Sequence, residues 1–337
     1  MNFSIKLQDK ISEFKLQINY MKKFPKIVFI GSTYFSLFSL KELHMKKYNI
    51  VGIITIPDFP KKKDKGFSPI KKYAIENNIP FLQPINLLDD FFLKNLKIWN
   101  ADIQIVVSFK ILPKNVWNLP KMGSFNLHAS LLPQYRGAAP INWVIINGEN
   151  KTGLTTFFIE KKIDYGKIIL QKEVKIEKNE TAGELENKLK KMSGSIIIET
   201  LEKIIENKIK PTDQKNINFL KYAPKIYNKD CRIQWDNPSI ESIYNKIRGL
   251  SPHPTAWTLL FFNQKKFIRL KIFIVNIIRK KHFFPIGLIF IISSNKMKIS
   301  VKEGFISIIE AQIEGKKRMN VKNLINGIKI KKNIFVQ

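Results

Sequence analysis

The segment from Ser124 to Trp143, SFNLHASLLPQYRGAAPINW, contains an Asn and a His two residues apart. In a β-strand, residues i and i+2 point to the same face, so Asn126 and His128 would project together. An Asn amide donates a hydrogen bond to an oxyanion, and an imidazole can donate or accept a proton near neutral pH. The pair therefore suits the attack of an amine on a carbonyl with no covalent enzyme intermediate. The alternative is a hydrogen-bonded Asn–His pair in the core.

A turn and a carboxylate add to this chemistry. After His128, the chain has Pro133 and Gly137, and small residues then open a helix at Pro140, so a flat ligand can approach the backbone there. Further along, EKKIDYGKI places Asp164 in a loop between two strands. A carboxylate in that loop could orient His128 and favour its protonated form by charge attraction. An ordinary turn aspartate is the alternative.

The elements expected to position these residues form a parallel sheet. Apolar runs alternate with helical patterns, which is typical of a sheet covered by helices on both faces. The predicted strands are residues 26–32, 49–57, 79–84, 102–109 and 124–130, with 153–160 and 167–176 extending the sheet in an antiparallel sense. The predicted helices are one ending near Leu43 and those at 68–77, 89–99 and 181–206. Ligands of such sheets bind at the strand ends, where Asn126 and His128 lie.

The C-terminal part of the sequence has a different pattern. Short β-runs with turn signals fill residues 267–313 after one helix near 240–250, which indicates a small OB-like β-barrel. The predicted fold class is α/β, with a doubly wound, Rossmann-like domain followed by this barrel. The expected boundaries are an extension or misplaced start at 1–20, a catalytic domain at 21–208, a linker at 209–228 and a basic barrel at 229–337.

The charge of the chain is strongly positive, at +31, with 52 Lys and only 6 Arg. Lys, Asn and Ile have AT-rich codons, so genomic drift could explain part of the excess. Residues 229–337, however, carry 21 Lys and Arg against 6 Asp and Glu, about twice the charge density of the rest. This asymmetry favours a polyanionic partner over an ordinary solvated surface.

Several classes of protein are excluded by what the sequence lacks. The single cysteine, Cys231, rules out a disulfide framework and a cysteine-based zinc site. GSTYFS after the first predicted strand is not the glycine pattern of a dinucleotide site. The other histidines lack ligand spacing, so no metal is expected. No signal peptide or membrane span is visible, which predicts a cytoplasmic protein with no membrane partner.

These motifs together resemble a known family. FNLHASLLPQYRGAAPINW, with IDYGKI about thirty residues on, resembles the folate-dependent formyltransferases. The resemblance extends from about Lys26 to Met319. Within the family it is strongest to the members that act on methionyl-tRNA, on the segments QIVVSFKILP, INGENKTGLTTF, YAPKI, CRIQW, IRGLSPHPTAW and EGKKRM. The resemblance implies that the formyl donor is 10-formyltetrahydrofolate and the acceptor is the α-amino group of methionine on initiator tRNA.

The resemblance also implies roles for individual residues. Asn126, His128 and Asp164 match the catalytic trio of the family, and its folate-contacting segment matches Ser130, Leu131, Leu132 and Pro133. Asn126 would donate to the formyl oxygen as it becomes tetrahedral. His128 would stabilise that oxygen or protonate the departing folate nitrogen, and Asp164 would hold His128. Tyr165 stands where the family usually has Thr, in a loop expected to line the pteridine pocket.

Two basic segments are the expected tRNA contacts. The family carries an inserted loop after the second strand, close to PDxPAGRG, and this chain has PDFPKKKDKGFSP instead. Lys63 replaces the expected arginine, which keeps the charge but loses the bidentate fork. The expected contacts are Lys61, Lys62, Lys63 and Lys65 in this loop, and Lys316, Lys317 and Arg318 near the C-terminus.

Two other functions remain open from the sequence alone. The first is a formyltransferase acting on a small amine, a glycinamide ribonucleotide or an amino sugar. A chain ending near residue 210 would have favoured the ribonucleotide, and the amino-sugar enzymes should lack the strong basic bias of the C-terminal part. The second is a catalytically inactive RNA-binding protein, which would have no need to keep the catalytic trio. A monomer is expected.

Overall fold

The computed structural model describes residues 25–58, 68–215, 218–236, 239–263, 266–327 and 334–337. The chain divides into two compact units, and it passes between them more than once. Within the described residues, the first unit comprises 25–133, 153–172 and 188–218, and the second comprises 134–152, 173–187 and 219–337. The domain boundaries expected from the sequence remain a prediction.

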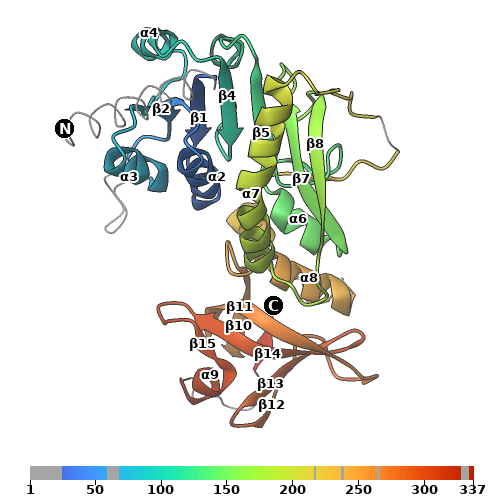
Figure 1. Cartoon of the computed structure of the whole chain (residues 1–337). Helices are drawn as coiled ribbons and strands as arrows, with labels where there is room; N and C mark the ends of the chain where they lie inside the picture. The colour runs from blue at the N-terminus through green and yellow to red at the C-terminus, as the bar shows by residue number, and fades with distance from the viewer. Residues whose placement is uncertain (1–24, 59–67, 216–217, 237–238, 264–265, 328–333) are drawn as a thin grey trace, which may run out of the picture. The chain divides into compact units, whose positions relative to one another are not determined.

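The core of the first unit is a seven-stranded sheet with the order β3-β2-β1-β4-β5-β7-β8 (Figure 1). The first five strands of this order are parallel, and β7 is antiparallel to β5. The predicted sheet is therefore confirmed, including its extension by two further strands. Its strands are β1 (Ile27–Gly31), β2 (Ile50–Ile54), β3 (Phe81–Leu82), β4 (Ile103–Val107), β5 (Ser124–His128), β7 (Lys151–Phe158) and β8 (Ile168–Lys175).

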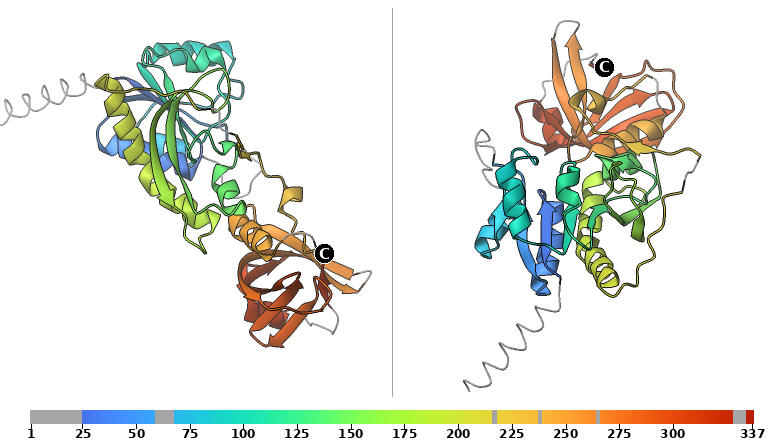
Figure 2. Two further views of the ribbon diagram at one scale, coloured as in Figure 1. Left: turned by 90° about the vertical axis from the view of Figure 1, so that its right-hand side faces the viewer. Right: turned by 90° about the horizontal axis from the view of Figure 1, so that it is seen from above.

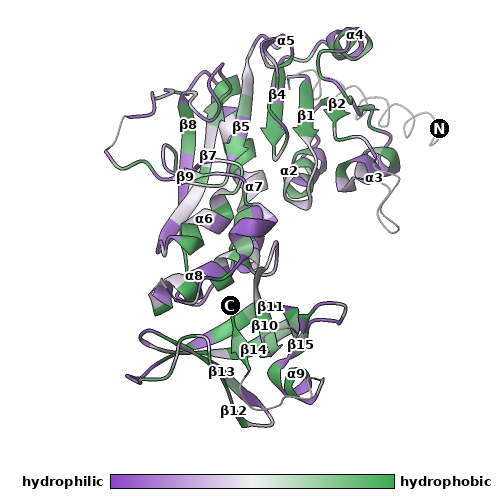
Figure 3. Ribbon diagram, turned by 180° about the vertical axis from the view of Figure 1, so that it is seen from behind, coloured by the Kyte–Doolittle hydropathy of each residue, from purple (hydrophilic) through white to green (hydrophobic). Residues whose placement is uncertain are grey.

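The burial of the strands follows their place in the sheet. β1 and β4, in the centre, are buried at every residue, which requires the continuous apolar runs of their sequences. β8, at the edge, has one buried residue, Val174, and its other residues are half-buried or exposed. Figure 3 shows the same contrast, with β1 and β4 hydrophobic and hydrophilic residues on β8.

Helices cover both faces of this sheet. Helix α4 (Asp90–Ile98) packs Phe92 and Leu96 against Val28, Ile30 and Val106 on one face. Helices α2 (Tyr34–Met45) and α7 (Ala182–Ile205) lie on the other face, where the hydroxyls of Ser39 and Ser193 are 2.9 Å apart. Figure 2 shows α4 and α7 on opposite sides of the strands. The doubly wound arrangement is thus confirmed.

Local signals set the starts of these helices. Ser68 precedes α3 (Pro69–Glu76) and its hydroxyl accepts a hydrogen bond from the amide of Lys71 at 3.0 Å. Asp89 caps α4 in the same way, through the amide of Phe92 at 2.9 Å. Such caps satisfy amide groups that have no partner inside the helix. The predicted helix ends differ from those observed by at most two residues, and the helix predicted near 240–250 coincides with α8 (Ile240–Leu250).

The second unit contains a curled antiparallel sheet. Its strands are β10 (Ala256–Asn263), β11 (Lys266–Arg279), β12 (Ile289–Ser293), β13 (Lys296–Val301), β14 (Gly304–Ile313), β15 (Met319–Asn320) and β16 (Phe335–Val336), in the order β12-β13-β14-β11-β10-β16 with β15 beside β14. The two edges meet, because the Ile289 amide donates to the Ile334 carbonyl at 3.1 Å and the Val336 amide to the Gly287 carbonyl at 2.9 Å. These bonds curl the sheet into a half-barrel, which confirms the predicted barrel-like C-terminal fold and leaves fewer open strand edges.

Helices and a short strand pair complete the second unit. Helix α6 (Pro140–Ile146) packs against α8 (Ile240–Leu250), where the Asn142 amide donates to the Gly249 carbonyl at 2.7 Å. β6 (Arg136–Gly137) pairs in parallel with β9 (Tyr222–Ala223). The remaining helices are α5 (Lys114–Trp117), the 3-10 turn η1 (Asn228–Cys231) and α9 (Val321–Gly327). Among the described residues, no helix combines the length and apolar character needed to cross a membrane.

Candidate active site

The predicted catalytic Asn and His lie on strand β5, between the parallel and antiparallel parts of the sheet. Asn126 is half-buried and lies opposite Phe157 of β7, while His128 is buried and lies opposite Thr155. Directly opposed residues of an antiparallel pair share a face, so both side chains lie on the same side of the sheet. His128 is the last residue of β5, at the carboxyl end expected for a ligand site.

The Asn126 side chain makes no hydrogen bond to any other residue in the part of the chain that is described. An Asn retained for a structural role inside a protein normally has such partners. Its amide group is therefore available to a bound molecule.

The segment after His128 is held by side chains of the next two strands. The Thr155 hydroxyl donates to the Ser130 carbonyl at 2.6 Å and accepts from the Leu132 amide at 3.2 Å. Gln171 of β8 donates to the Leu132 carbonyl at 2.8 Å and to the Thr155 hydroxyl at 2.9 Å. Thr155 and Gln171 have no local signal in the sequence, because only the strand pairing brings them beside this segment.

Burial divides the four predicted folate-contacting residues into two pairs. The side chains of Ser130 and Leu132 are buried, whereas Leu131 and Pro133 are half-exposed. Leu131 packs against Gly153, where a Cβ atom would be 2.5 Å from a Leu131 methyl carbon and 2.2 Å from the Lys172 carbonyl oxygen. Any contact to folate is therefore expected from Leu131, Pro133 and the backbone.

Asp164 lies on the loop between β7 and β8, as the sequence predicts. Its φ is +58°, a left-handed conformation that Asp tolerates better than most residues. The Gln214 side chain donates to the backbone carbonyls of Asp164 and Gly166, at 2.9 Å each. A Cβ on Gly166 would be 1.7 Å from the Phe158 carbonyl oxygen, so this close approach needs glycine.

We expect the substitution Gln214→Ala to lower kcat for the reaction of this site by about tenfold, because small displacements of catalytic groups cost rate steeply. The backbone that carries Asp164 would lose both of its hydrogen bonds to that side chain. Steady-state kinetics alongside thermal unfolding checks this. The matched control is Asn95→Ala, which removes a similar bond from Asn95 to the Phe91 carbonyl in α4. Equal kinetics for the two variants would contradict a role for Gln214 in holding the Asp164 loop.

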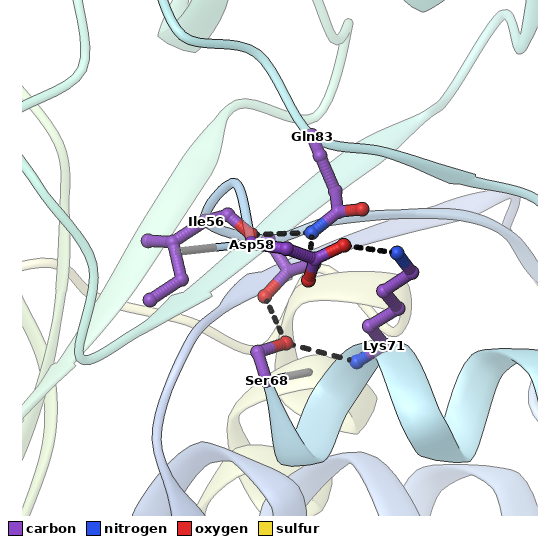
Figure 4. A network of polar contacts seen from close by, with 6 residues as sticks. Ile56, Asp58, Ser68, Lys71 and Gln83 are labelled. Atoms are coloured by element: carbon purple, nitrogen blue, oxygen red, sulfur yellow. Dashed lines mark hydrogen bonds and ion pairs between the residues drawn. The ribbon is translucent and has the colours of Figure 1, made fainter. Parts of the chain in front are cut away.

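Four of the predicted tRNA contacts, Lys61, Lys62, Lys63 and Lys65, lie outside the described residues. The residues on either side of them are joined by a polar network (Figure 4). Asp58 accepts from the ammonium of Lys71 and from Gln83 at 3.1 Å, and Gln83 also donates to the Ile56 carbonyl at 2.6 Å. Burial raises the pKa of Asp58, but the hydrogen bonds from Lys71 and Gln83 outweigh it, so the net pKa is lowered and the carboxylate stays charged.

The other three predicted tRNA contacts, Lys316, Lys317 and Arg318, are exposed on the turn between β14 and β15. Arg318 forms an ion pair with Glu310 and lies over the Phe273 ring at 4.4 Å. Neither lysine forms an ion pair with another described residue. Their ammonium groups are thus available to an anion. No group of three or more potential metal ligands occurs among the described residues.

Comparison with known proteins places this site in a family. Residues 25–201 match the formyl transferase family and residues 225–329 match its C-terminal domain. The chain belongs to the formyl transferase family. The resemblance inferred from the sequence is thereby confirmed for both parts of the molecule.

Relatives of this formyl transferase give a narrower comparison. It is 42% identical to a methionyl-tRNA formyltransferase of Bacteroides thetaiotaomicron, over 90% of this chain and 96% of the relative. It is 46% identical to one of Azobacteroides pseudotrichonymphae, over 90% and 95%. Among solved structures, WlaRD, a sugar 3N-formyl transferase crystallised with dTDP and 5-N-formyl-THF, is 26% identical with a TM-score of 0.58, over 87% of this chain and 99% of that one.

Proposed function

We propose that this formyl transferase moves the formyl group of 10-formyltetrahydrofolate to the α-amino group of methionine on initiator Met-tRNA, for translation initiation. The observation that carries the proposal is the identity of 41–46% over about 90% of the chain to relatives named methionyl-tRNA formyltransferase. The folate donor is supported by WlaRD, which was crystallised with 5-N-formyl-THF.

The proposed chemistry uses Asn126, His128 and Asp164. The neutral methionyl amine attacks the formyl carbon, and the formyl oxygen takes up negative charge as the carbon becomes tetrahedral. The Asn126 amide donates to that oxygen. His128, in its protonated form and held by Asp164, stabilises the oxygen or gives its proton to the folate nitrogen as the carbon–nitrogen bond breaks. The proton that the attacking amine loses replaces, by way of solvent, the proton given to the folate nitrogen. The products are therefore the formamide of the methionyl amine and tetrahydrofolate.

The rival acceptor is an amino sugar. WlaRD, which acts on a sugar, matches both parts of this chain, so possession of a C-terminal domain does not separate the two acceptors. Its 26% identity is well below that of the relatives named for methionyl-tRNA. The basic bias of residues 229–337 also favours a polyanion over a sugar nucleotide.

If the turn between β14 and β15 binds tRNA phosphates, the affinity for tRNA should depend on salt concentration through its lysines. We expect the double substitution of Lys316 and Lys317 to Ala to weaken tRNA binding and to reduce the slope of log K against log salt by about 0.9 for each lysine that contacts a duplex phosphate. Binding titrations at several salt concentrations measure it. Lys46 and Lys47, adjacent exposed lysines at the end of α2, provide the control pair. An unchanged slope would remove this turn from the interface.

We further propose that the protein acts in the cytoplasm as a monomer. The relatives are bacterial proteins named for a reaction of translation, which supports the cytoplasm. Sedimentation of the purified protein with and without tRNA tests the monomer.

The decisive experiment offers the purified protein 10-formyltetrahydrofolate and initiator Met-tRNA, and follows N-formylmethionyl-tRNA. Formation of that product would establish the acceptor. Folate binding without this product would move the proposal to a small-amine acceptor, which the same assay can test with a nucleotide-linked amino sugar. No folate binding would favour an inactive RNA-binding protein.

A further inference from the structure

A short loop of the barrel exposes aromatic side chains among lysines. This segment, called here the aromatic loop, comprises residues 280–287 between β11 and β12. Its sequence is KKHFFPIG. The loop lies entirely in the second unit, and the strands that it contacts, β12, β13 and β14, are neighbours in the barrel (Figure 1).

His282 fastens the aromatic loop to the barrel. Its Nδ1 accepts a hydrogen bond from the Phe284 amide at 3.2 Å, and its Nε2 is 2.8 Å from the Gly304 carbonyl oxygen. A carbonyl can only accept, so Nε2 carries the hydrogen and the ring is the neutral tautomer. The ring also packs against Phe305, with 4.5 Å between centroids. His282 is therefore an anchor of the loop, and its ring nitrogens are not available to a ligand.

The Phe284 ring, like that of His282, packs against the strands of the barrel sheet. It packs against Phe290 of β12 with 4.8 Å between ring centroids, and Phe290 in turn meets Phe305 edge-on at 5.7 Å. The Lys298 ammonium lies 3.6 Å from the centroid of the Phe305 ring, which brings a positive charge onto this face. Met297 and Ile299, on either side of Lys298, point instead into the barrel core. The aromatic cluster is thus on the outer face of the sheet.

The residue between these two anchors, Phe283, is left completely exposed, at 106% of its reference area. Phe284 keeps 49% of its area exposed and Ile292 of the neighbouring strand keeps 58%. Phe283 is thus an exposed aromatic ring on a loop that His282 and Phe284 anchor on either side of it, through hydrogen bonds and ring contacts. Such an exposed ring on an anchored loop points to an interaction site.

The rim of this surface is basic. Lys280 and Lys281 precede His282 in the loop, and Lys302 lies two residues before Gly304, whose carbonyl His282 contacts. All three are exposed, and none forms an ion pair with another residue of the described part of the chain. Aromatic rings interleaved with unpaired lysines fit a nucleic acid, whose bases stack on rings while its phosphates meet the ammonium groups.

We propose that the aromatic loop is a stacking platform for an unpaired base of the RNA substrate, with Phe283 as the stacking ring and Lys280 and Lys281 as contacts to the flanking phosphates. The inference rests on the proposed function for the identity of the RNA. The positive rim favours this occupant over a second copy of the chain, which would bring the same charges against it. A base within a duplex is already stacked on both faces, so the platform selects single-stranded nucleotides.

The test measures binding of three RNAs by fluorescence anisotropy: initiator tRNA, a short oligouridine and a short blunt RNA duplex. We expect Phe283→Ala to weaken binding of tRNA and oligouridine about tenfold and to leave duplex binding within about twofold, as loss of one stacked base requires. Phe283→Trp should bind like the wild type. The control is Phe91→Ala, which removes an exposed ring from α4, next to other lysines. Wild-type affinity of Phe283→Ala for both tRNA and oligouridine overturns the proposal.

Salt dependence separates the stacking ring from the lysines. Phe283→Ala should leave the slope of log K against log salt unchanged, whereas Lys280→Ala and Lys281→Ala should each lower it by about 0.7 for a single strand. A changed slope in Phe283→Ala would contradict stacking. A dimer in sedimentation that Phe283→Ala dissociates would also overturn the proposal, in favour of self-association.

The outcome is distinguishable from failure of the proposed function. If the wild type formylates Met-tRNA but Phe283→Ala binds both tRNA and oligouridine normally, the platform alone is wrong. If no formylation occurs but Phe283→Ala still loses oligouridine binding, the platform stands and the acceptor is wrong.

Discussion

His128→Ala is expected to lower kcat for formyl transfer to initiator Met-tRNA by at least about a hundredfold, in the range of a general acid–base group. His128 ends β5, beside Asn126 on one face of the sheet, and only about 6% of its surface is exposed. Its proposed tasks arise only as the formyl oxygen gains charge and the folate nitrogen departs. The loss should therefore fall on kcat, with folate affinity close to that of the wild type.

A second histidine supplies the control. His253 is exposed in the turn after α8, and its backbone carbonyl is the group that approaches Asn142, at 3.5 Å. His253→Ala should keep wild-type kcat. The measurement is single-turnover formylation at saturating folate, alongside folate titration. Retained activity in His128→Ala would show that the site uses another group, and equal losses in both variants would point to general destabilisation.

The sequence predicted the fold well because its signals are local. The parallel strands are continuous apolar runs, so residues 26–32 and 102–109 indicated the buried β1 and β4 without any knowledge of their neighbours. Helix starts were equally readable, since Ser68 and Asp89 act as caps from the position directly before the helix. The antiparallel sense predicted for residues 153–160 is confirmed by the pairing of β7 with β5, although strand direction depends on the connection between strands more than on side-chain pattern.

The site was predictable in part for the same reason. Asn126 and His128 are close in sequence, and the period of a strand places them on one face. Thr155, Gln171 and Gln214 are distant in sequence from the segments that they hold, at Ser130 and Asp164. A glutamine that bonds two carbonyls of a loop fifty residues away has no local signature. Such supporting residues appear only when the sheet brings the strands together.

The aromatic loop is a second feature that the sequence alone does not predict. In the sequence, His282 lies among lysines and is typical of a solvated surface residue. In the fold, its two ring nitrogens contact the Phe284 amide and the Gly304 carbonyl, and of the two neighbouring rings Phe284 packs against Phe290 while Phe283 is fully exposed. Composition predicted a basic surface, but only the contacts of His282 show where an aromatic ring lies within it.

Asn126→Ala is expected to lower kcat about a hundred- to a thousandfold, the usual cost of removing one donor to an oxyanion. For stability, in contrast to activity, we expect almost no effect of this substitution. Because the half-buried Asn126 amide bonds no other described residue, the substitution breaks no such hydrogen bond and should leave the melting temperature at or slightly above that of the wild type.

The combination separates the catalytic interpretation from the structural one. A core Asn lost to Ala would destabilise the fold and reduce activity only in proportion to the unfolded fraction. A substrate-binding Asn would give a well-folded protein that binds folate and transfers formyl slowly. Thermal unfolding, folate titration and single-turnover kinetics on the same preparation decide between them. A melting temperature lowered in step with the activity would assign Asn126 to the core, and the oxyanion would then need another donor.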